Sequence, residues 1–122
     1  MKTLRRLTLG AALAASLATL GPAAPASARD EQPRVVAIHA KRFAFEPKEI
    51  HLAKGEPVTL AVTSEDVTHG FFSRQFHVDE DLAPGKTVSI PLTPAEPGTY
   101  TVICDHYCGS GHGGMKMVIV VE

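Results

Sequence analysis

The chain has 122 residues and a formal net charge of −1, from 12 basic and 13 acidic side chains. Three of the basic residues fall within the first 28, so the remaining 94 residues (122 − 28) carry 9 − 13 = −4 and no basic cluster. Nucleic-acid binding is therefore excluded as the expected function, because a phosphate backbone is bound by clustered Lys and Arg. The length allows one small domain, and its acidic balance suits a basic protein partner.

Residues 1–28 have the layout of a secretory signal peptide. A basic start is followed by an uncharged stretch from 7 to 28, which ends in Ala26-Ser27-Ala28. Gly21, Pro22 and Pro25 interrupt the apolar part, whereas a membrane span needs roughly 20 unbroken apolar residues. We therefore expect cleavage after Ala28, a periplasmic or secreted protein and no membrane span in the mature chain, with an uncleaved anchor as the alternative.

Short strand-like runs follow, separated by turn residues. The run 57–63 shows the pattern, since Val58, Leu60 and Val62 alternate with smaller or polar residues. This period of two is typical of strands with one buried face. Similar runs lie at 35–38, 49–53, 87–92, 99–104 and 116–121, with turn-forming Gly and Pro between several of them at 54–57, 83–86 and 94–98. No stretch has a sustained helical period, and the sequence predicts an all-β domain of two sheets.

The loop between the last two predicted strands, 104–115, carries the chemistry. It holds Cys104, Cys108, His112 and Met115 together with four glycines. Thiolate, imidazole and thioether groups are the ligands that copper prefers over oxygen. An exported cysteine pair is most often a disulfide. Here, however, a bridge across four residues would constrain the unfolded chain little, so metal ligation is favoured.

A second segment, 66–72, contains His69 followed by Gly70 and two phenylalanines. A sandwich brings the ends of distant strands together at one pole, and His69 is expected to reach the cysteine loop there. Asp66, three residues earlier, either orients the His69 ring or caps a turn.

The pattern Cys104-x-x-x-Cys108-Gly109-x-Gly111-His112-x-x-Met115 resembles the binuclear copper (CuA) loop of cytochrome c oxidase subunit II. The 66–71 segment is similar to the first-ligand segment of that family and of the CuA domain of nitrous oxide reductase, and so is the lead-in at 97–100. The likeness spans about residues 40–121. It implies a cupredoxin-like Greek-key β-sandwich, so that residues 29–122 form a CuA-type cupredoxin domain.

The resemblance also implies a metal site and a role. Two copper ions would be bridged by the thiolates of Cys104 and Cys108, with His69 and His112 each on one copper. Met115 and the His106 carbonyl would be the weaker ligands. The protein is then a carrier of single electrons in a respiratory chain, between a cytochrome-type donor and an oxidase or reductase acceptor. We expect a monomer and not an enzyme in its own right, since no nucleophile–base pair is present.

Two departures and several alternatives remain open. Position 106 is His where the oxidases usually have Glu, and the domain has no Trp, which oxidase subunits commonly use to receive electrons. The alternatives are a copper delivery or storage protein, a detached oxidase subunit II, a zinc site or a mononuclear copper site that leaves Cys104 unused.

Outside this site, the remaining residues have structural interpretations. His39, His51 and His77 are predicted to be exposed, Met117 to lie in the core, and the Tyr100 hydroxyl to anchor a turn.

Overall fold

The computed structural model describes residues 10, 14–16, 18, 20–22 and 32–122. The predicted signal peptide, 1–28, lies for the most part outside these described residues. The chain divides into two units, Met1–Asp30 and Glu31–Glu122, and the fold is that of the second. In the described part of the chain, no helix has the length and apolar character needed to cross a membrane.

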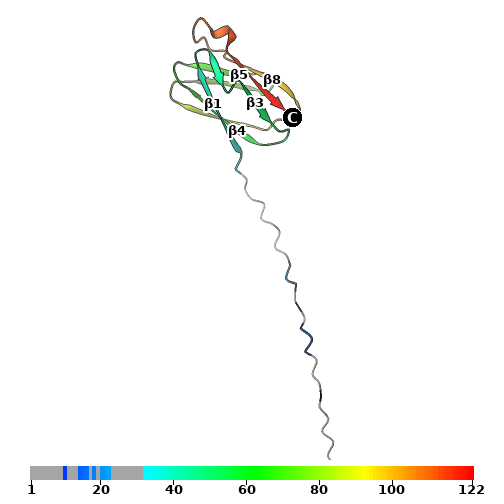
Figure 1. The fold of residues 1–122 in the computed structure, drawn as a ribbon. Helices are drawn as coiled ribbons and strands as arrows, with labels where there is room; N and C mark the ends of the chain where they lie inside the picture. Colours follow the sequence, from blue (N-terminus) through cyan, green and yellow to red (C-terminus); the bar gives the residue numbers. More distant parts are fainter. Residues whose placement is uncertain (1–9, 11–13, 17, 19, 23–31) are drawn as a thin grey trace, which may run out of the picture. The chain divides into compact units, whose positions relative to one another are not determined.

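Residues 32–122 form two packed β-sheets (Figure 1). The strand order is β2-β1-β4-β7 in one sheet and β3-β9-β8-β5-β6 in the other. The predicted all-β, two-sheet architecture is confirmed. The elements are β1 Arg34–Lys41, β2 Ala44–Glu46, β3 Glu49–Leu52, β4 Val58–Ser64, β5 His69–Ser73, β6 Val78–Leu82, β7 Thr87–Leu92, β8 Gly98–Ile103, the 3₁₀ turn η1 His112–Gly114, and β9 Lys116–Val121.

The core lies between the sheets and follows the predicted alternation. In β4 the side chains of Val58, Leu60 and Val62 are buried, while their neighbours are partly exposed. Phe45 of β2 and Phe71 of β5 meet edge to face at 5.7 Å and join the two sheets. Each such buried side chain contributes about 1.5–3 kcal/mol of transfer free energy, so the apolar faces of the strands hold the sandwich together.

Three strands do not follow the period-two signal. β2 has only three residues. β5 is buried at four of its five positions and therefore does not alternate. β6 contains Asp79, Glu80 and Asp81, and it lies at the edge of its sheet. Charges at an edge strand oppose pairing with another chain, which explains why β6 does not look like a strand.

The residues given structural interpretations lie where they are predicted. His39, His51 and His77 are exposed, and Met117 is buried. The Tyr100 hydroxyl donates to the Glu96 carbonyl at 2.7 Å, which closes the turn before β8.

His51 predicts a pH effect on stability that is independent of the metal site. Hydrogen bonds with Glu122 and Glu49 raise the pKa of His51 above its ordinary value. A raised pKa stabilises the fold fully below about pH 6.5, and the stabilisation is lost as the pH rises through the folded value. We expect His51→Gln to lower the free energy of unfolding at pH 5.5 more than at pH 8.5, as measured by chemical denaturation. An equal loss at both pH values would contradict this.

Candidate metal centre

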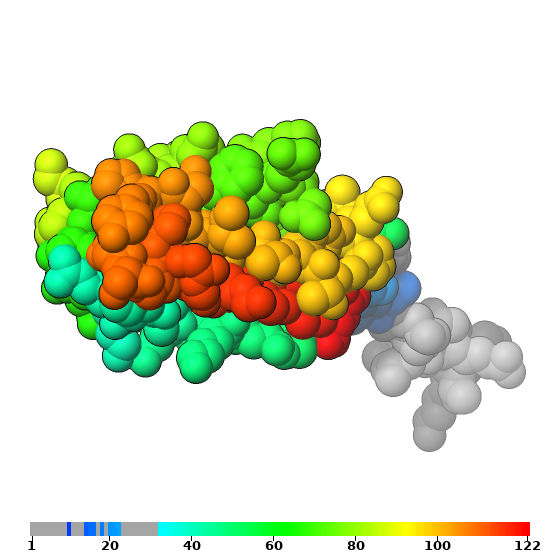
Figure 2. Space-filling view, turned by 90° about the horizontal axis from the view of Figure 1, so that it is seen from above, coloured from blue at the N-terminus to red at the C-terminus, as the bar shows by residue number. Residues whose placement is uncertain are grey.

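The cysteine loop is positioned by the antiparallel pair β8 and β9. Cys104 follows the last residue of β8, and its N–H donates to the Met115 carbonyl at 3.1 Å, which closes the neck of the loop. The loop then makes a turn in which the His112 N–H donates to the Gly109 carbonyl at 3.1 Å. It lies at one end of the sandwich, drawn in orange in Figure 1. In Figure 2 it is at the surface, between the β1–β2 and the β5–β6 regions.

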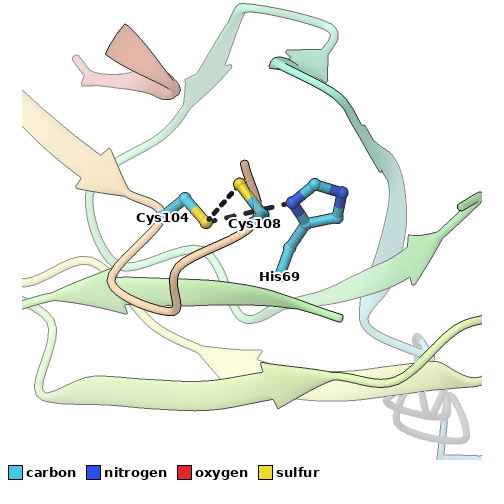
Figure 3. Close-up of side chains that lie close together, drawn as sticks. All are labelled: His69, Cys104 and Cys108. Atoms are coloured by element: carbon cyan, nitrogen blue, oxygen red, sulfur yellow. Dashed lines mark hydrogen bonds between the residues drawn. The ribbon is translucent and has the colours of Figure 1, made fainter. Parts of the chain in front are cut away.

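Every residue predicted as a ligand is brought to this end of the sandwich. The separations are 3.6 Å between the two Sγ atoms, 3.9 Å from Cys104 Sγ to His69 Nδ1, 3.7 Å from Cys108 Sγ to His112 Nδ1, 3.9 Å from Cys108 Sγ to Met115 Sδ, and 3.2 Å from Cys104 Sγ to the His106 carbonyl. Figure 3 shows the imidazole of His69 facing the two sulfurs. His69 comes from β5, far from the loop in sequence, as the sandwich argument predicts.

The geometry fits a soft metal and not a disulfide. Both cysteines are free and buried, and their sulfurs are well beyond the S–S bond length of about 2.05 Å. Two donors bound to one metal at about 2.3 Å with a tetrahedral angle lie about 3.8 Å apart. The separations between neighbouring sulfur and nitrogen donors here are 3.6–3.9 Å. The donor set of two thiols, two imidazoles and one thioether therefore has the composition and the spacing of a copper site.

Asp66 fixes the orientation of His69. Its Oδ1 accepts from His69 Nε2 at 2.7 Å and from the Val67 N–H at 2.7 Å, while its Oδ2 accepts from the Arg42 N–H at 2.8 Å. Burial raises the pKa of Asp66, but these hydrogen bonds outweigh it and lower the pKa to about 2. Since the ionised carboxylate can only accept, Nε2 carries the proton and the lone pair of Nδ1 faces Cys104. Asp66 both orients the ring and caps the turn.

Cys108 is held as a protonated thiol in the absence of a metal. Burial, followed by the neighbouring thiol of Cys104, raises the pKa of Cys108 to about 11. A metal binds the thiolate form, so loading the site releases protons.

His106 contributes to the site through its main chain. Its carbonyl faces Cys104, while its exposed ring has Nδ1 3.2 Å from the Tyr107 carbonyl. A histidine side chain at position 106 therefore leaves the carbonyl facing the site. A shallow cavity of about 310 Å³ reaches this part of the loop from the surface.

Three supporting residues were not predicted. The Gly70 N–H donates to Cys104 Sγ at 3.4 Å, and Arg42 Nε donates to the Cys108 carbonyl at 3.1 Å. The Phe43 ring packs against two glycines of the loop. The position of Gly70 directly after His69 is a signal that could have indicated its role, whereas Arg42 and Phe43 have no local signal.

Gly70 is required by a close approach of the loop. A Cβ at this position would lie 2.0 Å from Asp105 Oδ1 and 2.7 Å from the His106 amide nitrogen. We expect Gly70→Ala to displace the loop, to destabilise the fold by about 1–3 kcal/mol as overpacking does, and to reduce copper binding. Thermal unfolding and copper content would measure both effects.

Gly113→Ala is the matched control, because a Cβ there meets no atom within 4 Å. If Gly70→Ala behaved like Gly113→Ala, the close contact between β5 and the loop would be refuted.

Comparisons with known proteins place this geometry in a wider context. The sequence model described as "Cupredoxin-like domain" matches residues 10–121. Cytochrome c oxidase subunit 2 of Thermus thermophilus is 34% identical over 87 residues, covering 71% of this chain and 64% of that protein. Nitrous-oxide reductase of Cupriavidus necator is 34% identical over 91 residues, covering 71% of this chain and 14% of that protein. The chain thus spans less than two thirds of the length of either relative.

Solved structures agree on the fold. The periplasmic domain of cytochrome oxidase subunit II of Bradyrhizobium japonicum superimposes with a TM-score of 0.67 at 20% identity, over 73% of this chain and 83% of that domain.

Proposed function

Since the chain belongs to the family of cupredoxin-like domains, we propose that it is a copper-binding protein that carries single electrons. One observation supports this above all others. Two thiols, two imidazole Nδ1 atoms and a thioether converge, with 3.6–3.9 Å between neighbouring donors. The relatives of the chain include a cytochrome c oxidase subunit and a nitrous-oxide reductase, both named for oxidation–reduction reactions.

We assign two copper ions to the site. Cys104 and Cys108 lie between the two histidines, so both sulfurs are placed to be shared, with His69 beside Cys104 and His112 beside Cys108. Met115 and the His106 carbonyl would complete the two sides. Copper bound in this way would alternate between two oxidation states and so accept and release one electron.

The residues of the chain suit such a role. His69, Cys104 and Cys108 are 0%, 4% and 5% exposed, so this part of the site is shielded from water, while His112 is half-buried. The loop is tied to β5 and β9, which limits movement of the ligands when the charge of the site changes. A rigid, largely buried ligand set lowers the reorganisation that accompanies electron transfer.

Two of the alternatives have less support. Zinc does not use a thioether ligand, whereas Met115 is 2% exposed and its Sδ lies 3.9 Å from Cys108 Sγ. A mononuclear site would leave Cys104 without a role, although its Sγ lies 3.9 Å from His69 Nδ1, nearly as close as Cys108 Sγ lies to His112 Nδ1, at 3.7 Å.

For the cellular context, we propose export through residues 1–28, cleavage after Ala28 and work as a monomeric carrier outside the cytoplasm. The donor would be a cytochrome-type protein and the acceptor an oxidase or a reductase. The chain would not be an enzyme in its own right.

Copper retention separates a carrier from a delivery protein. A carrier should keep two coppers per chain through repeated cycles of reduction and oxidation. Elemental analysis of the protein after each cycle would measure this. Transfer of most of the copper to a metal-free acceptor domain within the same number of cycles would support delivery instead.

A further inference from the structure

The turn between β1 and β2 supports the site from outside its predicted ligands. Arg42 in this turn donates its main-chain N–H to Asp66 Oδ2 at 2.8 Å, and its side-chain Nε–H to the Cys108 carbonyl at 3.1 Å. Asp66 in turn holds the His69 ring. One residue therefore connects the imidazole side of the site with the cysteine loop.

The adjacent residue, Phe43, packs on the same loop. A Cβ at Gly109 would lie 2.8 Å from the Phe43 ring, and a Cβ at Gly111 would lie 2.4 Å from it. The two glycines thus allow the turn to approach the loop closely. The hydrogen bond from Arg42 lies beside this apolar contact, at the segment that carries Cys108.

We propose that Arg42 is a positioning residue of the metal centre. It holds the Cys108 segment at its place relative to the Asp66–His69 pair, and it places a fixed positive charge beside the site. Because the metal is itself proposed, this role rests on the proposed copper-binding function. The guanidinium carries a positive charge and donates from a planar group that lysine does not reproduce. A nearby positive charge favours the reduced state of a metal centre, so Arg42 raises the reduction potential.

Three variants at this position separate the hydrogen bond from the charge. Arg42→Met removes both, Arg42→Gln keeps a donor without a charge, and Arg42→Lys keeps the charge without the planar group. Arg74→Met is the matched control, because Arg74 is an exposed arginine in the turn after β5. His69 is the first residue of this strand, and Arg74 follows its last residue.

The first measurement is amide hydrogen exchange in the metal-free protein. In Arg42→Met we expect the amides of 109–115 to exchange about tenfold faster than in the wild type. Loss of the hydrogen bond to the Cys108 carbonyl would make local opening of the loop about tenfold more frequent, and exchange follows this opening. Arg42→Gln should recover most of the protection, and Arg74→Met should match the wild type. Wild-type exchange rates throughout the loop of Arg42→Met would overturn the positioning role.

The second measurement is the reduction potential of the copper-loaded protein. In Arg42→Met and Arg42→Gln we expect the reduction equilibrium constant to fall about tenfold, equivalent to about 59 mV for one electron, while Arg42→Lys stays close to the wild type. Wild-type potentials in both neutral variants would overturn the electrostatic role. The two tests can fail separately. A wild-type protein that failed to bind copper would refute the proposed function. Amide exchange is measured without metal, so it would still decide whether Arg42 positions the loop.

Discussion

Replacing Cys104 with serine should reduce the copper content from the proposed two ions per chain to one at most. The hydroxyl of serine is a poor ligand for copper compared with a thiolate. Cys104 Sγ is also the atom that lies nearest both to His69 Nδ1 and to the second sulfur, at 3.9 and 3.6 Å. Its loss would remove the proposed bridge on the His69 side, while Cys108, His112 and Met115 would stay together. Elemental analysis and electron spin resonance would then find a single copper with its unpaired electron on one nucleus.

Met117→Leu provides the control for this variant. Met117 is a buried methionine of β9, 1% exposed and two positions beyond Met115. Its thioether takes no part in the sulfur and nitrogen contacts of the site. Its replacement should leave the copper content and the spectrum unchanged. A Cys104→Ser protein that still held two coppers with a shared electron would show that the bridging role is wrong.

Replacing Asp66 with asparagine should weaken copper binding by about 10–100-fold, the usual range for residues that orient a metal-ligating histidine. Both carboxylate oxygens accept from main-chain amides, at Val67 and Arg42, and those amides cannot reverse their roles. The amide NH₂ of asparagine would place a donor against one of these donors. At the Oδ1 position it would face both the Val67 N–H and His69 Nε2, and the proton of the ring would then move to Nδ1, where we propose that the metal binds.

Glu65→Gln is the matched control for Asp66→Asn. It makes the same change of charge at the preceding residue, whose carboxylate contacts the exposed His39 at 3.2 Å and not the site. Competition with a chelator of known affinity would measure both variants. Equal copper affinities in Asp66→Asn and Glu65→Gln would show that the carboxylate does not prepare His69 for binding.

The alternation of apolar residues is what made the fold predictable. The side chains of Val58, Leu60 and Val62 form the buried face of β4, and this local pattern determines which side of the strand enters the core. The strands without this signal have physical reasons to lack it. β5 is covered on both faces, and β6 lies at a sheet edge, where acidic residues are favoured.

The cluster of candidate ligands was predictable because five of them lie within twelve residues, on the connection between two strands. His69 required a resemblance as well as chemistry, since its distance from Cys104 depends on the packing of β5 beside β8. Arg42 could not be predicted. Its partner, Cys108, is 66 positions away, and a hydrogen bond to a main-chain carbonyl leaves no pattern in the side chains of either segment.

The most direct test is electron spin resonance of the oxidised, copper-loaded wild-type protein, with the copper content measured on the same sample. We predict two coppers per chain and a hyperfine pattern of one unpaired electron shared equally by two copper nuclei. A pattern from one copper nucleus, or a protein that retained zinc and no copper, would contradict the assignment of His69, Cys104, Cys108 and His112 to a two-copper site.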